Sequence, residues 1–188
     1  MKYHIIGLTG RNASGKGTVA SFLMKSSFVY HSLSDTLRAE LKSKNLEESR
    51  ENLIRIGNVL REEGGPGILA DLMVPNLNSL ENHIVDSIRN PIEVNSLNRE
   101  YPNHKFTLIA VDASPETRYE RLKQRNRSGD SSSWEQFLAQ EKIEESSIDP
   151  NKQQLLATIK KADFHIGNSG TILELENNIN EIIYKLKS

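Results

Sequence analysis

The chain has 188 residues, of which 24 are lysine or arginine and 25 are aspartate or glutamate, so its formal net charge is −1. This length suits one domain with a full core, and the near-neutral charge argues against binding nucleic acid or an anionic membrane through an overall basic field. The lack of cysteine excludes disulfides and thiolate metal sites, and no apolar run approaches the roughly 18 residues that span a bilayer. We therefore expect a single cytoplasmic domain over residues 1–188, with no nucleic-acid or membrane partner.

Apolar runs alternate with helix-like segments along the chain. The runs YHIIGLTG, HIVDSI and KFTLIAVDA have the length of buried parallel strands, and a shorter run, DFHIGN, follows near the C-terminus. Apolar residues recur at helical spacing in the segments 16–26, 35–43, 50–62, 115–127 and 171–187. Strands that alternate with helices predict an α/β fold, in which a parallel sheet is covered by helices on both faces to give three layers.

Two stretches interrupt this alternation. Residues 35–75 hold two or more helices without an intervening strand, which predicts a helical insertion between the second and third strands. Residues 127–142 are polar and serine-rich, which is typical of a mobile surface segment. Because binding functions are often carried by segments outside the regular scaffold, both stretches are candidates for contact with a ligand.

The stretch GLTGRNASGKGT, residues 7–18, follows the first predicted strand and precedes the first predicted helix. Gly10 and Gly15 allow the loop to turn so that successive backbone N–H groups point at one anion, and Lys16 adds a flexible cation. The following helix presents its positive N-terminal end to the same charge. The spacing therefore predicts a phosphate-binding loop. Its candidate ligand-binding residues are Gly10, Asn12, Ala13, Ser14, Gly15, Lys16, Gly17 and Thr18.

Gly17 stands immediately after Lys16, where most such loops carry a hydroxyl that binds Mg²⁺ directly. Thr18 is the nearest hydroxyl, and Asp86, at the end of the strand-like run HIVDSI, can organise Mg²⁺ through water. Arg89 follows three residues later and can make a bidentate contact with an acceptor phosphate. We expect Thr18 and Asp86 at the metal, and Arg89 at the acceptor and in catalysis.

Arginines recur at spacings of three and four in the predicted helix 115–127, so Arg118, Arg121 and Arg125 line one helical face. We expect Arg118 to be a solvated residue paired with glutamates. Arg121, Arg125 and Arg127 suit a lid over residues 121–142 that closes on transferring phosphates. Because phosphoryl transfer spreads negative charge over equatorial oxygens, these three arginines join Lys16 as candidate catalytic residues.

The segments GRNASGKGT, SLSDTLRAE and VDSIRNP, together with the arginine-rich helix, resemble the nucleoside monophosphate kinase-like P-loop family. Within that family the chain is most similar to an adenylate-kinase-related, dephospho-coenzyme A kinase-like group. The loop departs from the adenylate kinase pattern G-x-P-G-x-G-K-G-T at Asn12 and Ala13. The resemblance implies a nucleotide-kinase-like fold, ATP as phosphate donor, Mg²⁺, and an acceptor-binding role for the helical insertion 35–75.

The resemblance also suggests roles for residues that spacing alone does not assign. It places Ser34, Asp35 and Arg38 where adenylate kinases hold the acceptor. By analogy with deoxynucleotide kinases, Arg50 and Arg61 belong to helices over the acceptor base. A likeness of the C-terminal segment to dephospho-coenzyme A kinases makes Asn168 and Gly170 candidate adenine contacts.

Three functions remain open on these features. The leading one is a phosphotransferase that moves the γ-phosphate of Mg-ATP to a nucleoside or deoxynucleoside monophosphate. The second is a dephospho-coenzyme A kinase, whose sugar hydroxyl acceptor needs a carboxylate base, with Asp35 as the candidate. The third is a non-catalytic ATP-binding regulatory protein. The first two imply a small-molecule acceptor as partner.

Overall fold

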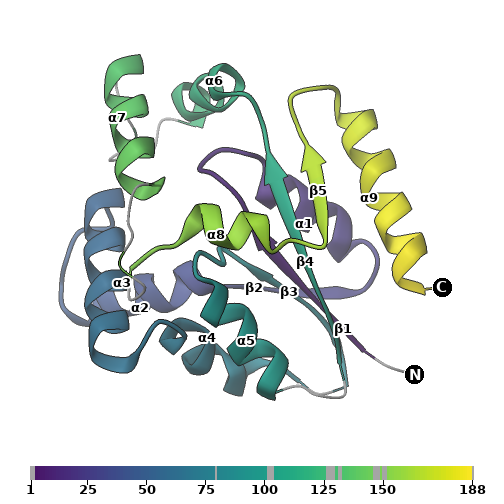
Figure 1. Ribbon diagram of the computed structural model, residues 1–188, viewed down its shortest axis with the longest axis horizontal. Coiled ribbons are helices and arrows are strands. Elements are labelled where there is room, and N and C mark those ends of the chain that lie inside the picture. The colour runs from purple at the N-terminus through teal and green to yellow at the C-terminus, as the bar shows by residue number, and fades with distance from the viewer. Residues whose placement is uncertain are drawn as a thin grey trace.

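A parallel sheet organises the part of the chain that the structure describes. The structure, a computed structural model, describes residues 3–78, 80–100, 104–125, 130, 133–145, 149 and 152–187. Five strands lie in the order β2-β3-β1-β4-β5 (Figure 1). Their bounds are β1 His4–Thr9, β2 Phe28–Ser32, β3 Asn82–Asp86, β4 Lys105–Asp112 and β5 Phe164–Gly167. The parallel sheet and its helices confirm the predicted α/β fold.

Side chains of β1 alternate between the two faces of the sheet, and helices cover each face. Ile6 and Leu8 pack in one apolar cluster with residues of α1 (Lys16–Met24) and α9 (Ile172–Lys187). Ile5 packs in the other cluster, which draws on α2 (Leu33–Ser43), α3 (Arg50–Gly64), α4 (Ile68–Met73) and α5 (Pro91–Glu100). The two clusters account for the three layers seen in Figure 1.

Helices α2, α3 and α4 occupy the stretch between β2 and β3 that the sequence marks as helical, and a short 3-10 helix, Val74–Asn76, follows them. Serine side chains fix where the first two helices begin. The Ser32 hydroxyl accepts a hydrogen bond from the Ser34 backbone N–H, and the Ser49 hydroxyl accepts one from the Asn52 N–H. Such caps satisfy N–H groups that have no partner within the helix.

The serine-rich stretch 127–142 is not irregular throughout. Helix α7 spans Trp134–Glu145, whereas residues 127–129, 131 and 132 lie outside the described part of the chain. The buried Phe137 ring packs against Trp134 and, on α6 (Pro115–Arg125), against Tyr119, at centroid distances of 5.3 and 5.6 Å. Aromatic contact with α6 therefore stabilises a helix where composition predicted a mobile segment.

The strand order places the glycine-rich loop at the centre of the sheet's carboxyl edge. The chain runs from β1 outward to β2, returns to β3 beside β1, and then crosses to β4 on the other side. The loop after β1 therefore lies where the direction of winding reverses, which is the usual ligand crevice of open parallel sheets. Helix α8 (Leu155–Lys160), which precedes β5, lies in front of the sheet in the view of Figure 1.

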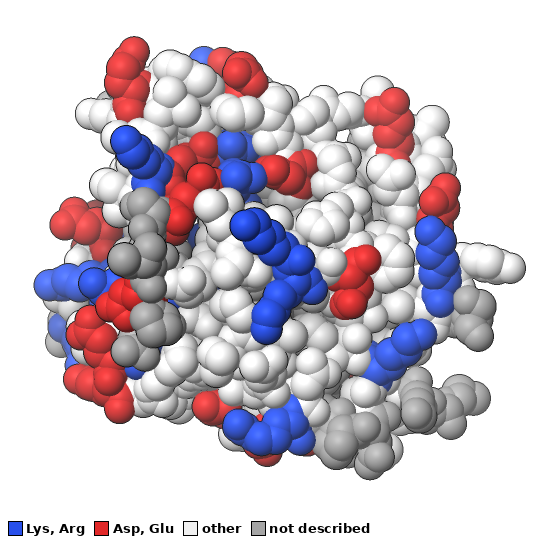
Figure 2. Space-filling model, viewed as in Figure 1, with Lys and Arg blue, Asp and Glu red and all other residues white. Residues whose placement is uncertain are grey.

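On the face shown in Figure 2, lysine and arginine side chains are interspersed with aspartate and glutamate. This mixed surface agrees with the formal net charge of −1. Among the helices that the structure describes, none combines the length and apolar character needed to cross a membrane.

Candidate active site

The loop between β1 and α1 has the backbone geometry that an anion-binding loop requires. Gly10 has a φ of +138° and Gly15 a φ of +99°, in a region that favours glycine. A Cβ at Gly10 would lie 2.0 Å from the carbonyl oxygen of Val111, so β4 also excludes a side chain there. Helix α1 begins at Lys16, directly after this turn, and its N-terminus faces the space above the loop.

Lys16 folds back over the loop. Its Nζ donates to the carbonyl oxygens of Gly10 and Arg11, both at 2.9 Å. Burial lowers the pKa of Lys16 to about 8; Asp86 opposes this shift, and the positive charge of Arg89 adds to it. A lysine held this way has no carboxylate in direct contact within the described residues, so its charge is available to an incoming phosphate.

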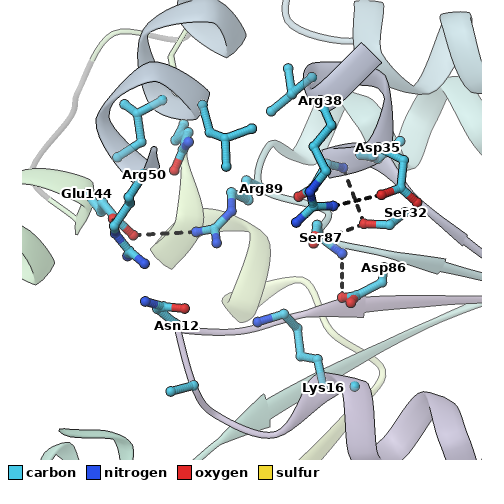
Figure 3. A pocket seen from close by; sticks show the side chains of 18 of the residues that line it. Asn12, Lys16, Ser32, Asp35, Arg38, Arg50, Asp86, Ser87, Arg89 and Glu144 are labelled. Carbon is cyan, nitrogen blue, oxygen red and sulfur yellow. Dashed lines mark hydrogen bonds and ion pairs between the residues drawn. The ribbon is translucent and has the colours of Figure 1, made fainter. Parts of the chain in front are cut away.

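A cavity of about 1130 Å³ opens above the loop, between α1 and the helices α2 and α3. Figure 3 shows Asn12 and Lys16 on one side of it and Arg38 and Arg89 on the other. Most of the candidate residues from the sequence line this cavity: Asn12, Ala13, Gly15, Lys16, Gly17, Thr18, Ser34, Asp35, Arg38, Arg61, Asp86, Arg89, Arg121 and Arg125. Residues distant in the sequence therefore converge on one space.

The remaining candidates lie elsewhere. Gly10 and Ser14 are buried within the loop itself. Asn168 is buried behind the loop, where its Nδ2 donates to the Ser14 carbonyl at 2.8 Å. Gly170 is exposed beyond it, and Arg127 lies outside the described residues. Asn168 thus supports the backbone of the loop through this hydrogen bond. The contact of Asn168 and Gly170 with adenine stays a prediction.

The arginines that the sequence predicts at an acceptor all lie close to carboxylates. Arg38 forms ion pairs with Asp35 at 2.7 Å and with Glu48 at 2.8 Å. Arg89 extends from the loop after β3 into the cavity, where its Nη1 lies 3.5 Å from a carboxylate oxygen of Glu144 (Figure 3). That Nη1 is buried and makes no hydrogen bond within the described residues. A buried guanidinium N–H without an acceptor is the kind of group that an oxyanion satisfies.

Arg61 is almost completely buried, and its side chain makes structural contacts at the cavity wall. It is 1% exposed and pairs at 2.7 Å with Glu93, which is 0% exposed. Glu93 also accepts hydrogen bonds from the backbone N–H groups of Arg89 and Asn90, at 2.8 and 3.0 Å. The Arg61–Glu93 pair therefore holds the loop that carries Arg89, in addition to reaching the cavity wall.

Asp86 ends β3 at the edge of the cavity and is 7% exposed. It accepts hydrogen bonds from the Ser87 backbone N–H at 2.5 Å and from the Tyr30 hydroxyl at 3.1 Å. Burial and the neighbouring Asp86 charge raise the pKa of Tyr30 to about 12, so this hydroxyl remains a donor. Within the described residues no cluster of three or more acidic or histidine side chains forms a metal cage. Asp86 and the Thr18 hydroxyl are oxygen groups that fit a largely water-coordinated Mg²⁺.

The arginines of α6 lie beside the loop. Arg121 donates to the carbonyls of Asn168 at 2.8 Å and of Ser14 at 3.3 Å. Arg125 donates to Asn12 at 3.2 Å and pairs with Asp130. Arg118 pairs with a glutamate, Glu141 of α7, but the expectation that it is solvated was wrong. Its side chain is 2% exposed, because α7 covers it, and it donates to the Ala113 carbonyl.

The chain matches the family described as AAA domain over residues 6–148. The UPF0200 protein PYRAB09750 of Pyrococcus abyssi is 34% identical to it over 186 residues, covering 97% of this chain and 96% of the relative. The chain belongs to the UPF0200 family of P-loop proteins. The loop predicted to bind phosphate, residues 10–18, lies within the matched range, and we call it the P-loop.

Solved kinases share this P-loop fold. Shikimate kinase from Bacteroides thetaiotaomicron matches with a TM-score of 0.58 at 14% identity, over 98% of this chain and 99% of that chain. The APS kinase CysC of Mycobacterium tuberculosis, solved in complex with AMPPNP and APS, gives 0.56 at 17% identity, over 100% and 99%. At these identities the likeness shows the fold, which is that of P-loop small-molecule kinases.

Sequence reasoning missed Glu144, a charged residue that lines the cavity. Glu144 of α7 is buried beside Arg89 and forms an ion pair with Arg50. Arg50 and Glu144 are 94 residues apart, and Glu144 follows the polar, serine-rich stretch 127–142. No local signal in the sequence indicates that α7 returns to this site.

Proposed function

We propose that this protein is a phosphotransferase that moves the γ-phosphate of Mg-ATP to a nucleoside or deoxynucleoside monophosphate. The observation that carries the proposal is the content of one cavity. Lys16 and the P-loop lie on one side, and Arg38 and Arg89 lie on the other. Two separate cationic groups suit two phosphate-bearing ligands better than one.

Each part of the cavity has a role in this proposal. The backbone N–H groups of residues 10–18 and the start of α1 bind the donor phosphates, and Lys16 neutralises the phosphate being transferred. Arg38 and Arg89 hold the acceptor phosphate, on the helical insertion 35–75 and the loop after β3. Bound Mg²⁺ would be held by water, Thr18 and Asp86, and supplies charge neutralisation between donor phosphates.

In this proposal, the arginines of α6 stabilise the negative charge that develops during transfer, and the lid excludes water. Arg125 contacts Asn12 of the P-loop, and Arg121 contacts its carbonyls, so α6 already lies against the donor side. With Arg127 and the residues of α7 up to 142, they make up the proposed lid over 121–142. Closure of a lid removes water that would otherwise accept the phosphoryl group.

The ion pairs favour a phosphate acceptor over a sugar hydroxyl. Asp35 would be the base for a dephospho-coenzyme A kinase, but its carboxylate pairs with Arg38 at 2.7 Å. Arg38 therefore competes with a sugar hydroxyl for this carboxylate, which a general base must turn toward its substrate. A monophosphate is already a nucleophile and needs no base.

The test is acceptor-dependent formation of ADP from Mg-ATP. The panel contains ribo- and deoxyribonucleoside monophosphates and dephospho-coenzyme A. We expect turnover with one or a few monophosphates, and a loss of at least about 100-fold in kcat for Lys16→Met. Lys42→Met, at an exposed position of α2, is the matched control and should keep full activity. Tight ATP binding without turnover on any monophosphate would overturn the proposal, and turnover on dephospho-coenzyme A alone would replace it.

A further inference from the structure

Helix α7 connects the two halves of the site through adjacent carboxylates. Glu145 pairs with Arg11 of the P-loop at 2.5 Å. Glu144, the residue before it, points toward the acceptor side and meets Arg50 and Arg89 (Figure 3). The N-terminal half of α7 is held separately, by the packing of Phe137 on α6. Of these contacts, only that of Glu144 lies in the acceptor part of the cavity.

The Glu144 carboxylate bridges two guanidinium groups. One oxygen accepts from Arg50, whose Nε lies 2.9 Å away, and the other lies 3.5 Å from Nη1 of Arg89. Both arginine side chains are largely buried, with 16% and 19% exposed, and the Glu144 side chain is 7% exposed. A carboxylate between two arginines offers the paired oxygens and negative charge that a phosphate offers to the same groups.

The charges around this point favour a more negative occupant than a single carboxylate. The charges of Arg50, Arg61, Asp86 and Glu144 all act on Arg89. Lys16 interacts with Arg89, Arg50, Asp86 and Glu144, and Glu93 pairs with Arg61. Four cations thus face three anions, and withdrawal of Glu144 leaves an excess of two positive charges. A phosphate monoester carries between about one and a half and two negative charges at neutral pH. A monoester would therefore neutralise the site more completely than Glu144 does.

We propose that Arg50 and Arg89 bind the phosphate of the acceptor, and that Glu144 is an internal competitor which this phosphate displaces. The proposal rests on the proposed function and names the residues of its acceptor site. It adds Arg50 to the binding residues and makes the free protein self-inhibited at the acceptor side. Binding of the acceptor then exchanges one anion for another and releases α7 from the acceptor half.

The exchange has a cost that sets the acceptor affinity. Each acceptor molecule must replace the ion pairs that Glu144 makes, so the measured affinity is lower than the arginines alone would give. Neutralising Glu144 removes the competitor and leaves both guanidinium groups without a counterion. Anion binding to Glu144→Gln is therefore tighter than to the unaltered protein.

The experiment measures binding of inorganic phosphate and of nucleoside monophosphates by calorimetry, without ATP. We expect Glu144→Gln to lower the Kd for phosphate by about tenfold, and Glu144→Asp, whose shorter side chain cannot span both arginines, to lower it less. Arg50→Met should raise the Kd by about tenfold or more. Glu135→Gln, at an exposed position of the same helix, makes the same charge change away from the arginines and should leave the Kd unchanged. Circular dichroism checks that each variant is folded.

The outcomes separate this inference from the proposed function, because binding needs no turnover. Unchanged or weaker phosphate binding in both folded Glu144 variants overturns the inference, even if the enzyme phosphorylates a monophosphate. Tighter binding without any turnover supports the anion site and counts against the kinase. Where turnover exists, the KM for the acceptor should fall about tenfold in Glu144→Gln while the KM for ATP stays constant.

Discussion

The two ends of the cavity that we propose for the donor and for the acceptor present positive charge by different means. The P-loop is one contiguous stretch, residues 10–18, and its binding groups are backbone N–H dipoles, a helix N-terminus and Lys16. The acceptor end uses full charges, on Arg38, Arg50 and Arg89, that come from three separate segments. Dipoles need no counterion, and Lys16 is held by backbone carbonyl oxygens, whereas Arg38 and Arg50 are paired with carboxylates.

The difference explains why carboxylates accompany every acceptor arginine. Arg38 is paired with Asp35 and Glu48, and Arg50 with Glu144. In the proposed reaction, the donor end binds without breaking an ion pair, but the acceptor end exchanges ion pairs for ligand contacts. We therefore expect substitutions at the acceptor end to change stability and binding by altering charge. Substitutions at the donor end should change them by altering the backbone geometry of the loop.

The largest effect is expected from the buried pair behind the acceptor end. Arg61→Met leaves the Glu93 carboxylate buried without its cation, and breaking such a pair costs about 3–5 kcal/mol. We expect the free energy of unfolding, measured with urea, to fall by this amount. Arg99→Met is the control, because its pairs with Asp71 and Glu100 are exposed and contribute less than about 1 kcal/mol. If Arg61→Met lowered the free energy of unfolding by less than about 1 kcal/mol, the buried ion pair would not be what stabilises the acceptor end.

At the donor end, two glycines of the P-loop should respond in opposite ways. Gly15→Ala places a Cβ 2.0 Å from Nδ2 of Asn168 at a φ of +99°, and backbone strain alone costs about 1–3 kcal/mol. A Cβ at Gly17 meets no atom within 4 Å, so Gly17→Ala should be neutral or stabilise α1 by up to about 1 kcal/mol. Urea unfolding of both variants measures the contrast. Equal destabilisation would remove the geometric account of the loop.

The donor end comes from one contiguous stretch of sequence, whereas the acceptor end is assembled from separate segments. This difference decides how much of each end could be predicted from the sequence. The P-loop and its strand–loop–helix setting were recognisable because all of its parts are adjacent in the chain. Arg89 was recognisable because it follows the strand that ends at Asp86. The Arg50–Glu144 pair was not, because 94 residues separate its members and α7 is stabilised by contact with α6. Long-range charge pairing leaves no periodic or local trace.

Lys16 is the point at which the two ends influence each other. Burial lowers its pKa to about 8 in the free protein, with Arg89 and Arg50 contributing. Bound phosphates raise the pKa, so ATP binding above pH 8 takes up a proton and the affinity falls as the pH rises through 8. We expect the ATP Kd to rise about tenfold from pH 7 to pH 9. Lys16→Arg keeps its charge across this range and should remove the dependence. Calorimetry in buffers of different ionisation enthalpy also measures the proton uptake.

The smallest effect is expected from Tyr30, which links β2 on the acceptor side to Asp86 beside the P-loop. Tyr30→Phe removes a hydrogen bond of 3.1 Å, worth about 1 kcal/mol of stability. The Ser87 backbone N–H still donates to Asp86 at 2.5 Å, so the carboxylate keeps its orientation. ATP affinity should therefore change by less than about threefold, within the range of one weak hydrogen bond. Tyr184→Phe, at a position 76% exposed on α9, is the control and should alter neither quantity. A tenfold loss of ATP affinity in Tyr30→Phe would mean that the donor end depends on a distant side chain after all, and that local backbone geometry does not suffice to build it.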